Sequence, residues 1–210
     1  MKLYDSAWAP SPRRVRIYLA EKNISVEYVS IDLRQNEQLD PAYLAINPRG
    51  VVPALVLDDG EVICESTAIC RYFEALHPEP PLFGTDPLSI ARIEAWTRQI
   101  ESDGYAAAVY AFRNSKPQME GRALPGKLPP TSIIPDLVER AAIMWRAFIN
   151  ALETRLGESL WIAGDAFSFA DITALVTIDF AARSGLTVSD GHKALKNWHD
   201  IMSARPSAAA

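Results

Sequence analysis

The sequence predicts an α/β domain followed by an all-α helical domain, and three observations lead to this prediction. Strand and helix patterns alternate along the first part of the chain, up to about residue 80. The segment that follows, His77-Pro78-Glu79-Pro80-Pro81-Leu82-Phe83-Gly84, has the composition of a stiff connector. Beyond it, the periodic segments have helical spacing. We therefore expect an N-terminal domain at 1–80, a linker at 81–87 and a C-terminal domain at 88–210.

The N-terminal elements follow from local signals. We expect strands at 2–4 and 26–31, helices opening at Pro10 and at 40–44, a hairpin at 54–63 and a further helix after Glu65. Pro10 and Pro12 suit the first turn of a helix, and Asp40 stands at a cap position. The Asp59-Gly60 turn is the strongest hairpin signal in the chain. A parallel pair followed by a hairpin indicates a thioredoxin-like α/β domain.

The second domain is predicted from four segments of helical periodicity, at 88–115, 135–156, 168–184 and 191–204. Between the first two, residues 116–135 are rich in proline and glycine and are expected to form an excursion near the mouth of a site. Ser168 and Asp171 match a capping box. We interpret Asp171 as a structural cap in preference to a catalytic acid, because exposed amides at a helix start account for it.

Composition and charge exclude several classes of function. The formal net charge is -5 with both signs evenly mixed, which argues against a nucleic-acid partner. The chain shows no signal peptide and no apolar run of membrane-spanning length, so we expect a cytoplasmic protein that does not enter a membrane. Cys64 and Cys70, assigned to one helical region, are interpreted as reduced packing residues. Three histidines without ligand spacing predict no metal site.

The residues around Pro53 and Ser66 point to a ligand. Pro53 cannot donate to a sheet ladder, so the backbone beside it is left open for another partner. Ser66 stands at a predicted helix N-terminus, where unpaired amides and a free hydroxyl favour a carboxylate. Glu65 suits an ammonium group, and the backbone of Val52 suits β-type pairing with a peptide unit. This set matches the zwitterionic end of an amino acid or peptide.

Motifs along nearly the whole chain resemble those of the cytosolic glutathione transferases. They are Asn47-Pro48-Arg49-Gly50-Val51-Val52-Pro53-Ala54-Leu55, Asp58-Asp59-Gly60, Glu65-Ser66-Thr67-Ala68-Ile69, Trp161-Ile162-Ala163-Gly164-Asp165, Phe167-Ser168, Ala170-Asp171 and Arg205-Pro206-Ser207. The segment from Tyr4 to Asn23 most resembles an atypical fungal and bacterial branch of that family, which uses no tyrosine, serine or cysteine to activate the thiol.

The resemblance implies glutathione as co-substrate, no metal, and a homodimer. It implies a cis peptide bond before Pro53, with Val52 facing the cysteinyl unit of glutathione and with Glu65 and Ser66 on its γ-glutamyl end. Gln38 stands where many members bind the glycyl carboxylate; its alternative interpretation is a solvated loop residue.

The group that activates the thiol stays open between two locations. Ala9 occupies the position of the serine used in theta-like and zeta-like members, so Ser11 is the nearest hydroxyl, either as catalyst or as an ordinary helix cap. In the atypical branch, side chains of the second domain hold a water. Arg113, Asn114 and Ser115 correspond to them here, without that branch's histidine.

Apolar residues and the family's chemistry together suggest the reaction. Trp8, Tyr105, Tyr110 and Phe112 form the expected acceptor pocket, with core packing as the alternative role of these aromatic rings. The resemblance implies conjugation of the glutathione thiolate to an apolar electrophile. Glutathione-dependent peroxide reduction or isomerisation is a second enzymatic possibility, and a non-catalytic glutathione-binding or regulatory protein of the same fold is the alternative from another class.

Overall fold

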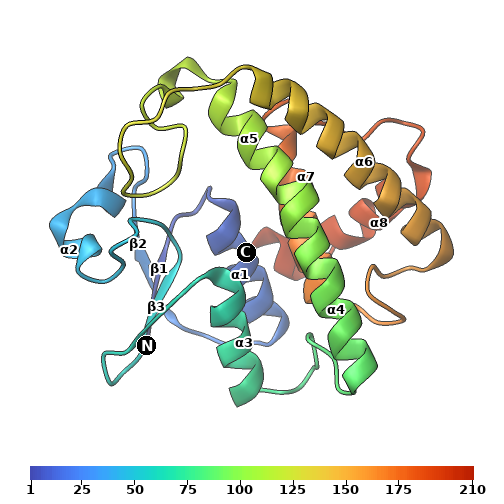
Figure 1. The fold of residues 1–210 in the computed structure, drawn as a ribbon. Helices are drawn as coiled ribbons and strands as arrows, with labels where there is room; N and C mark the ends of the chain where they lie inside the picture. The colour runs from blue at the N-terminus through green and yellow to red at the C-terminus, as the bar shows by residue number, and fades with distance from the viewer.

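The computed structural model describes residues 1–210 and shows a small sheet flanked by helices beside a larger helical bundle (Figure 1). The strand order is β2-β1-β3-β4. Strand β1 (Lys2–Asp5) is parallel to β2 (Glu27–Ser30) and antiparallel to β3 (Ala54–Val56), which forms a hairpin with β4 (Val62–Cys64). This mixed sheet confirms the thioredoxin-like N-terminal domain.

Three helices belong to the first domain: α1 (Pro10–Glu21), α2 (Pro41–Leu44) and α3 (Ser66–Leu76). Their first turns test two expectations. Asp40 occupies the N-cap position of α2, as expected, although its side chain makes no capping hydrogen bond. The N-cap of α1 is Ala9, so Ser11 lies inside the helix and is not a cap.

The assignment of both cysteines to one helix is also wrong. Cys64 ends β4 and is half-buried, whereas Cys70 is buried in α3. Glu65 between them has φ 72°, a left-handed conformation that ends the strand before the helix begins. Both thiols are unpaired, and burial raises the pKa of each.

The second domain is all helical. Its helices are α4 (Pro87–Gln99), α5 (Ala106–Asn114), α6 (Asp136–Glu158), α7 (Phe169–Ala182) and α8 (Lys193–Ser203), with a π-helical segment over Ile100–Tyr105 joining α4 to α5. Short 3₁₀ turns lie at Glu37–Leu39, Pro117–Met119 and Pro206–Ala209. Helix α7 is central, since every residue except Asp179 and Ala182 is buried.

One hydrophobic core spans both domains and includes the connecting segment. Leu82 and Phe83 are buried, and the Phe83 ring stacks on Phe169 of α7 with centroids 4.5 Å apart. The Tyr18 ring of α1 packs edge-on against Phe169 at 6.2 Å. The segment predicted as a linker is therefore part of the packing that fixes the two domains against each other.

The capping box at the start of α7 is confirmed and extends beyond its helix. The buried Asp171 carboxylate accepts hydrogen bonds from the Ser168 amide at 3.0 Å, the Ile162 amide at 3.1 Å and the Trp198 indole N–H at 3.0 Å. It thus joins the start of α7 to the preceding loop and to α8. Burial raises the pKa of Asp171 to about 6, against the opposing effect of these hydrogen bonds.

This raised pKa predicts a pH-dependent stability difference between the wild type and Asp171→Asn. The folded state binds the Asp171 proton more tightly than the unfolded state, so this stabilisation is full below the unfolded pKa and is lost as pH rises through about 6. We expect the wild type's stability relative to Asp171→Asn to fall by about 2 kcal/mol between about pH 4.5 and 7. Urea unfolding of both proteins across this range measures the effect. A pH-independent difference would contradict the raised pKa.

Candidate functional site

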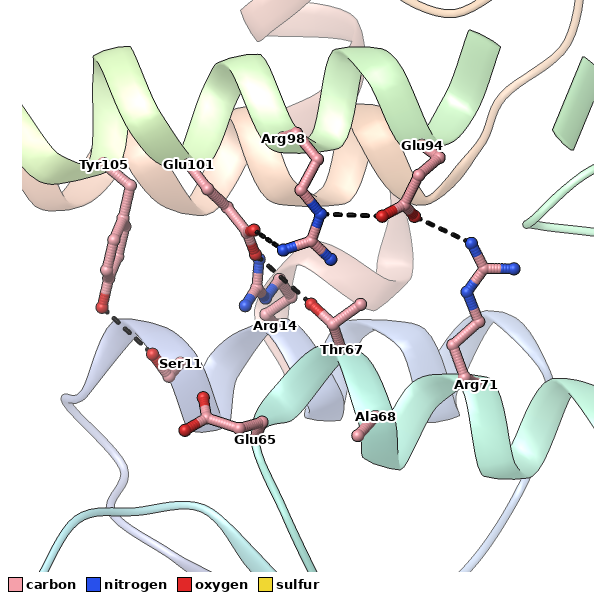
Figure 2. A pocket seen from close by; sticks show the side chains of 10 residues that line it. All are labelled: Ser11, Arg14, Glu65, Thr67, Ala68, Arg71, Glu94, Arg98, Glu101 and Tyr105. Carbon is pink, nitrogen blue, oxygen red and sulfur yellow. Dashed lines mark hydrogen bonds and ion pairs between the residues drawn. The ribbon is translucent and has the colours of Figure 1, made fainter. Parts of the chain in front are cut away.

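A cavity of about 680 Å³ opens between the two domains (Figure 2). The first domain lines it from α1 and from the start of α3, and the second domain lines it from α4 and the π-helical segment. The lining residues are Ser11, Arg14, Glu65, Thr67, Ala68, Arg71, Glu94, Arg98, Glu101 and Tyr105. Eight of these ten residues are polar or charged, since only two are hydrophobic, so the cavity suits a polar, charged ligand.

An open backbone edge lies beside this cavity. The peptide bond between Val52 and Pro53 is cis, as expected. Ala54 pairs with Cys64, so continuing that antiparallel register places Val52 opposite Ser66 at the start of α3. The N–H and C=O groups of Val52 make no hydrogen bond within the chain. By contrast, the Val51 carbonyl accepts from Tyr43 Oη at 2.6 Å and from Asn47 Nδ2 at 2.7 Å.

The N-terminus of α3 is uncapped by any side chain, so its first amides are available to an anion. The expectation that the Ser66 hydroxyl is free is wrong. Ser66 is buried, and its Oγ accepts from Arg14 Nη2 at 2.6 Å and from Arg14 Nε at 3.1 Å. A hydroxyl that accepts twice keeps its own hydrogen for donation. Glu65, exposed at the rim, pairs with Arg49.

A charged network behind Ser66 links the two domains. Arg14 Nη1 lies 2.6 Å from Glu101 Oε1, and the same carboxylate accepts from Thr67 Oγ1 at 3.3 Å and from Arg98 Nη1 at 2.8 Å. Glu94 continues it, accepting from Arg98 and from Arg71 of α3 (Figure 2). Sequence reasoning missed these residues, although the spacing of 94, 98 and 101 places charged groups on one helix face.

Ser11 and Tyr105 meet across the domain boundary, with 3.0 Å between Ser11 Oγ and Tyr105 Oη (Figure 2). Tyr105 ends the π-helical segment, a distortion often found at functional sites. Gly104 before it allows α6 to approach closely, because a Cβ there would lie 2.4 Å from Phe148 Cε1. Burial raises the pKa of Tyr105, and the hydrogen bond with Ser11 opposes that rise.

The other predicted catalytic residues, Arg113 and Ser115, do not line this cavity. Arg113 donates from Nη1 to the Arg122 carbonyl at 2.8 Å, and burial lowers the pKa of its guanidinium. Asn114 is buried and bonds to the Tyr110 carbonyl and the Ile134 amide. Ser115 is the exposed C-cap of α5. Arg113 and Asn114 thus brace the 116–135 excursion.

The predicted acceptor aromatics separate into two groups. Tyr105 and Phe112 both pack against Phe180 of α7, with centroids 6.0 and 5.1 Å apart, and sequence reasoning missed Phe180. Tyr110 is exposed on α5. The backbone carbonyl of Trp8 accepts from Arg183 Nη1 at 2.6 Å. The indole N–H of Trp8 is buried and has no hydrogen-bond partner.

Gln38 is buried in the 3₁₀ turn at Glu37–Leu39, so its interpretation as a solvated loop residue is wrong. Its side-chain Oε1 is buried and has no hydrogen-bond partner. The chain contains no group of three or more His, Cys, Asp or Glu side chains arranged to hold a metal ion. None of its helices combines the length and the apolar character needed to cross a membrane.

Comparison with known proteins gives consistent matches. The family model for the glutathione S-transferase N-terminal domain matches residues 3–81, and that for the C-terminal domain matches residues 138–206. Glutathione S-transferase 2 of Saccharomyces cerevisiae is 37% identical over 213 residues, covering 99% of this chain and 87% of the yeast protein.

Two crystal structures extend this similarity to the fold. Gtt2 from Saccharomyces cerevisiae matches with a TM-score of 0.90 at 35% identity, covering 100% of this chain and 99% of that one. A glutathione transferase homologue from Sulfitobacter, solved with bound glutathione, matches with a TM-score of 0.81 at 25% identity, covering 99% and 94%. The match to yeast proteins agrees with the fungal branch that the motifs of the first helix indicate. The chain belongs to the glutathione S-transferase family and is an enzyme of that family.

Proposed function

We propose that this enzyme conjugates the glutathione thiolate to an apolar electrophilic small molecule. The observation that carries the proposal is the unpaired backbone of Val52, which lies opposite Ser66 at the uncapped start of α3. A β-type edge beside a helix N-terminus suits a short peptide with a free α-carboxylate. Glutathione has such a carboxylate at its γ-glutamyl end.

Each part of glutathione has a proposed partner. The γ-glutamyl carboxylate accepts from the α3 amides and from the hydroxyl of Ser66, which Arg14 orients. Its ammonium group takes Glu65, and the cysteinyl unit pairs with Val52. The glycyl carboxylate lies near Gln38, whose amide N–H groups can donate to it.

Ser11 is the proposed donor to the sulfur. The 3.0 Å contact allows either hydroxyl to donate, and we propose that Tyr105 donates to Ser11 Oγ when glutathione is bound, which leaves the Ser11 hydrogen to stabilise the thiolate. The thiolate then attacks the electrophilic carbon of the acceptor, forming a C–S bond as the leaving group departs or as the double bond accepts a proton. We place the apolar acceptor against the ring of Tyr105, which lines the cavity and packs on Phe180, with Phe112, Trp8 and Tyr110 as the other proposed acceptor residues.

The setting that we propose follows the family: a cytoplasmic homodimer that serves in detoxification. Binding and turnover test the function together. We expect glutathione to bind at millimolar concentration or below by calorimetry, with turnover on some member of a panel of activated aryl halides, unsaturated carbonyls and organic hydroperoxides. Binding without turnover would support the non-catalytic alternative, which the named relatives do not favour. Absence of binding would exclude a glutathione function.

Replacing Ser11 by alanine tests the thiol-activating group. We expect kcat/KM to fall about 10-fold to 100-fold, because the thiolate loses a hydrogen-bond donor. For the same reason we expect the pKa of the thiol of bound glutathione to rise by about one unit. Ultraviolet titration of the thiolate in the binary complex measures this pKa. Ser115→Ala is the matched comparison. It removes a second-domain hydroxyl that, in the alternative mechanism, would hold the water that activates the thiol. Loss of activity in Ser115→Ala alone would transfer thiol activation to that location.

A further inference from the structure

The excursion at 116–135, referred to below as the arm, crosses from the second domain to the first. In Figure 1 it leaves the end of α5, extends beside α2 and returns to α6. At its tip, the Lys127 amide donates to the Arg49 carbonyl at 2.8 Å. This bond lies three residues before Val52, the residue on which glutathione docks in the proposed function.

The arm approaches this docking loop, residues 49–52, too closely for a side chain at the contact. Gly126 has φ +85°, and a Cβ there would lie 2.3 Å from the Arg49 carbonyl oxygen and 3.0 Å from Val51 Cγ1. Gly50 on the other side has φ +63°, and a Cβ there would lie 3.2 Å from the Lys127 nitrogen. Two glycines therefore face each other where the domains touch.

The arm is braced at its base. The Ala123 amide donates to the Thr131 carbonyl at 3.1 Å, and the Thr131 amide donates to the Gly121 carbonyl at 3.2 Å, closing the loop on itself. Arg113 and Asn114 at the end of α5 bond to residues 122 and 134 on its two sides. The tip is consequently held by the second domain and not by the loop alone.

We propose that Gly126 and Lys127 are positioning residues for glutathione binding: through the Arg49 carbonyl, they hold the docking loop in the conformation that presents Val52. Tyr43 and Asn47, from the first domain, hold the carbonyl of Val51, two residues further along the same loop. The loop is thus fixed from both domains. This proposal rests on the proposed function, since it assigns the arm a role only in glutathione binding.

Glycine substitutions along the arm offer a matched test. In Gly126→Ala the added Cβ forces the arm off the Arg49 carbonyl, so we expect the KM and Kd for glutathione to rise about five-fold to ten-fold, with kcat within about two-fold of the wild type. Gly121→Ala places the same residue at φ +76° with nothing within 4 Å, so it carries similar backbone strain without the clash. This control is expected to bind glutathione as the wild type does.

A second measurement needs no variant. If the arm favours glutathione binding, glutathione must stabilise the arm by the same factor, because coupling between two binding events is reciprocal. We expect hydrogen exchange at the Lys127 amide to slow about five-fold to ten-fold when the wild type is saturated with glutathione. This result decides the proposal even if Gly126→Ala does not fold.

The outcomes separate the two proposals. Suppose that the wild type binds glutathione, but that Gly126→Ala and Gly121→Ala bind it with equal affinity, or that hydrogen exchange at the Lys127 amide of the wild type does not change. Either result overturns the role of the arm and leaves the proposed function standing. A wild type that binds no glutathione overturns both.

Discussion

Replacing Asp171 by alanine is expected to lower the free energy of unfolding by about 4 kcal/mol. The substitution leaves four buried donors without an acceptor: the amides of Ser168 and Ile162, the Ser168 hydroxyl and the indole N–H of Trp198. Each unsatisfied buried donor costs about 1–3 kcal/mol, and α7 also loses the Asp171 half of its capping box. Because a domain is stable by only about 5–15 kcal/mol, much of this protein's stability depends on one carboxylate.

Urea unfolding with an unchanged m-value is the appropriate measurement, since it isolates stability from changes in the unfolded chain. Asp165→Ala is the matched control. Asp165 is exposed, lies in the same connection between α6 and α7, and makes no hydrogen bond through its side chain. We expect that control to stay within about 0.5 kcal/mol of the wild type. Equal losses in the two variants would mean that the buried network contributes nothing specific.

Replacing Arg14 by methionine is expected to lower kcat/KM for glutathione about 100-fold. Arg14 holds Ser66 Oγ through two N–H groups and pairs with Glu101, and its side chain is only 13% exposed. Without Arg14, the Ser66 hydroxyl loses the two hydrogen bonds that orient it. The Glu101 carboxylate loses a positive partner, so more of its negative charge faces the cavity. Two charge-assisted hydrogen bonds of this kind account for a factor of about 100.

The control for Arg14 is Arg98→Met. Arg98 bonds to the same Glu101 carboxylate, but its side chain is 57% exposed, so screening reduces its contribution and we expect a loss of less than about 3-fold. Arg14→Lys keeps the charge but not the forked geometry, and an intermediate loss is expected. Steady-state kinetics with glutathione varied at fixed acceptor measures all three. An Arg14→Met enzyme no weaker than Arg98→Met would remove Arg14 from the binding site.

The sequence predicted the local features well because their signals lie within a few residues. The Asp59-Gly60 turn, the proline-led start of α1 and the Ser168–Asp171 capping box each depend on neighbours along the chain, and the structure contains all three. The same locality explains the error at Cys64. Strand β4 has only three residues, too few for its alternation to stand apart from the helix that follows Glu65.

The side chains around the ligand required the fold. Ser11 and Tyr105 are 94 positions apart, and Arg14 lies 52 positions from Ser66 and 87 from Glu101. Their contacts depend on how α1, α3 and the second domain pack, and no local periodicity encodes that arrangement. For the same reason, the sequence alone did not distinguish a solvated Gln38 from a ligand-binding one. Whether a polar residue in a turn is buried depends on the segments that cover it, and Gln38 is buried.

What the sequence determined by itself is therefore the order of elements, the family resemblance and the backbone edge at Val52 on which a peptide is proposed to dock. Only the tertiary structure decided which groups face that edge: the Arg14–Ser66–Glu101 network, the Ser11–Tyr105 pair and the contact of the arm with Arg49. The physical reason is range. Turns, caps and strand edges arise from neighbouring residues, whereas the site joins side chains from two domains that meet only when the shared core forms.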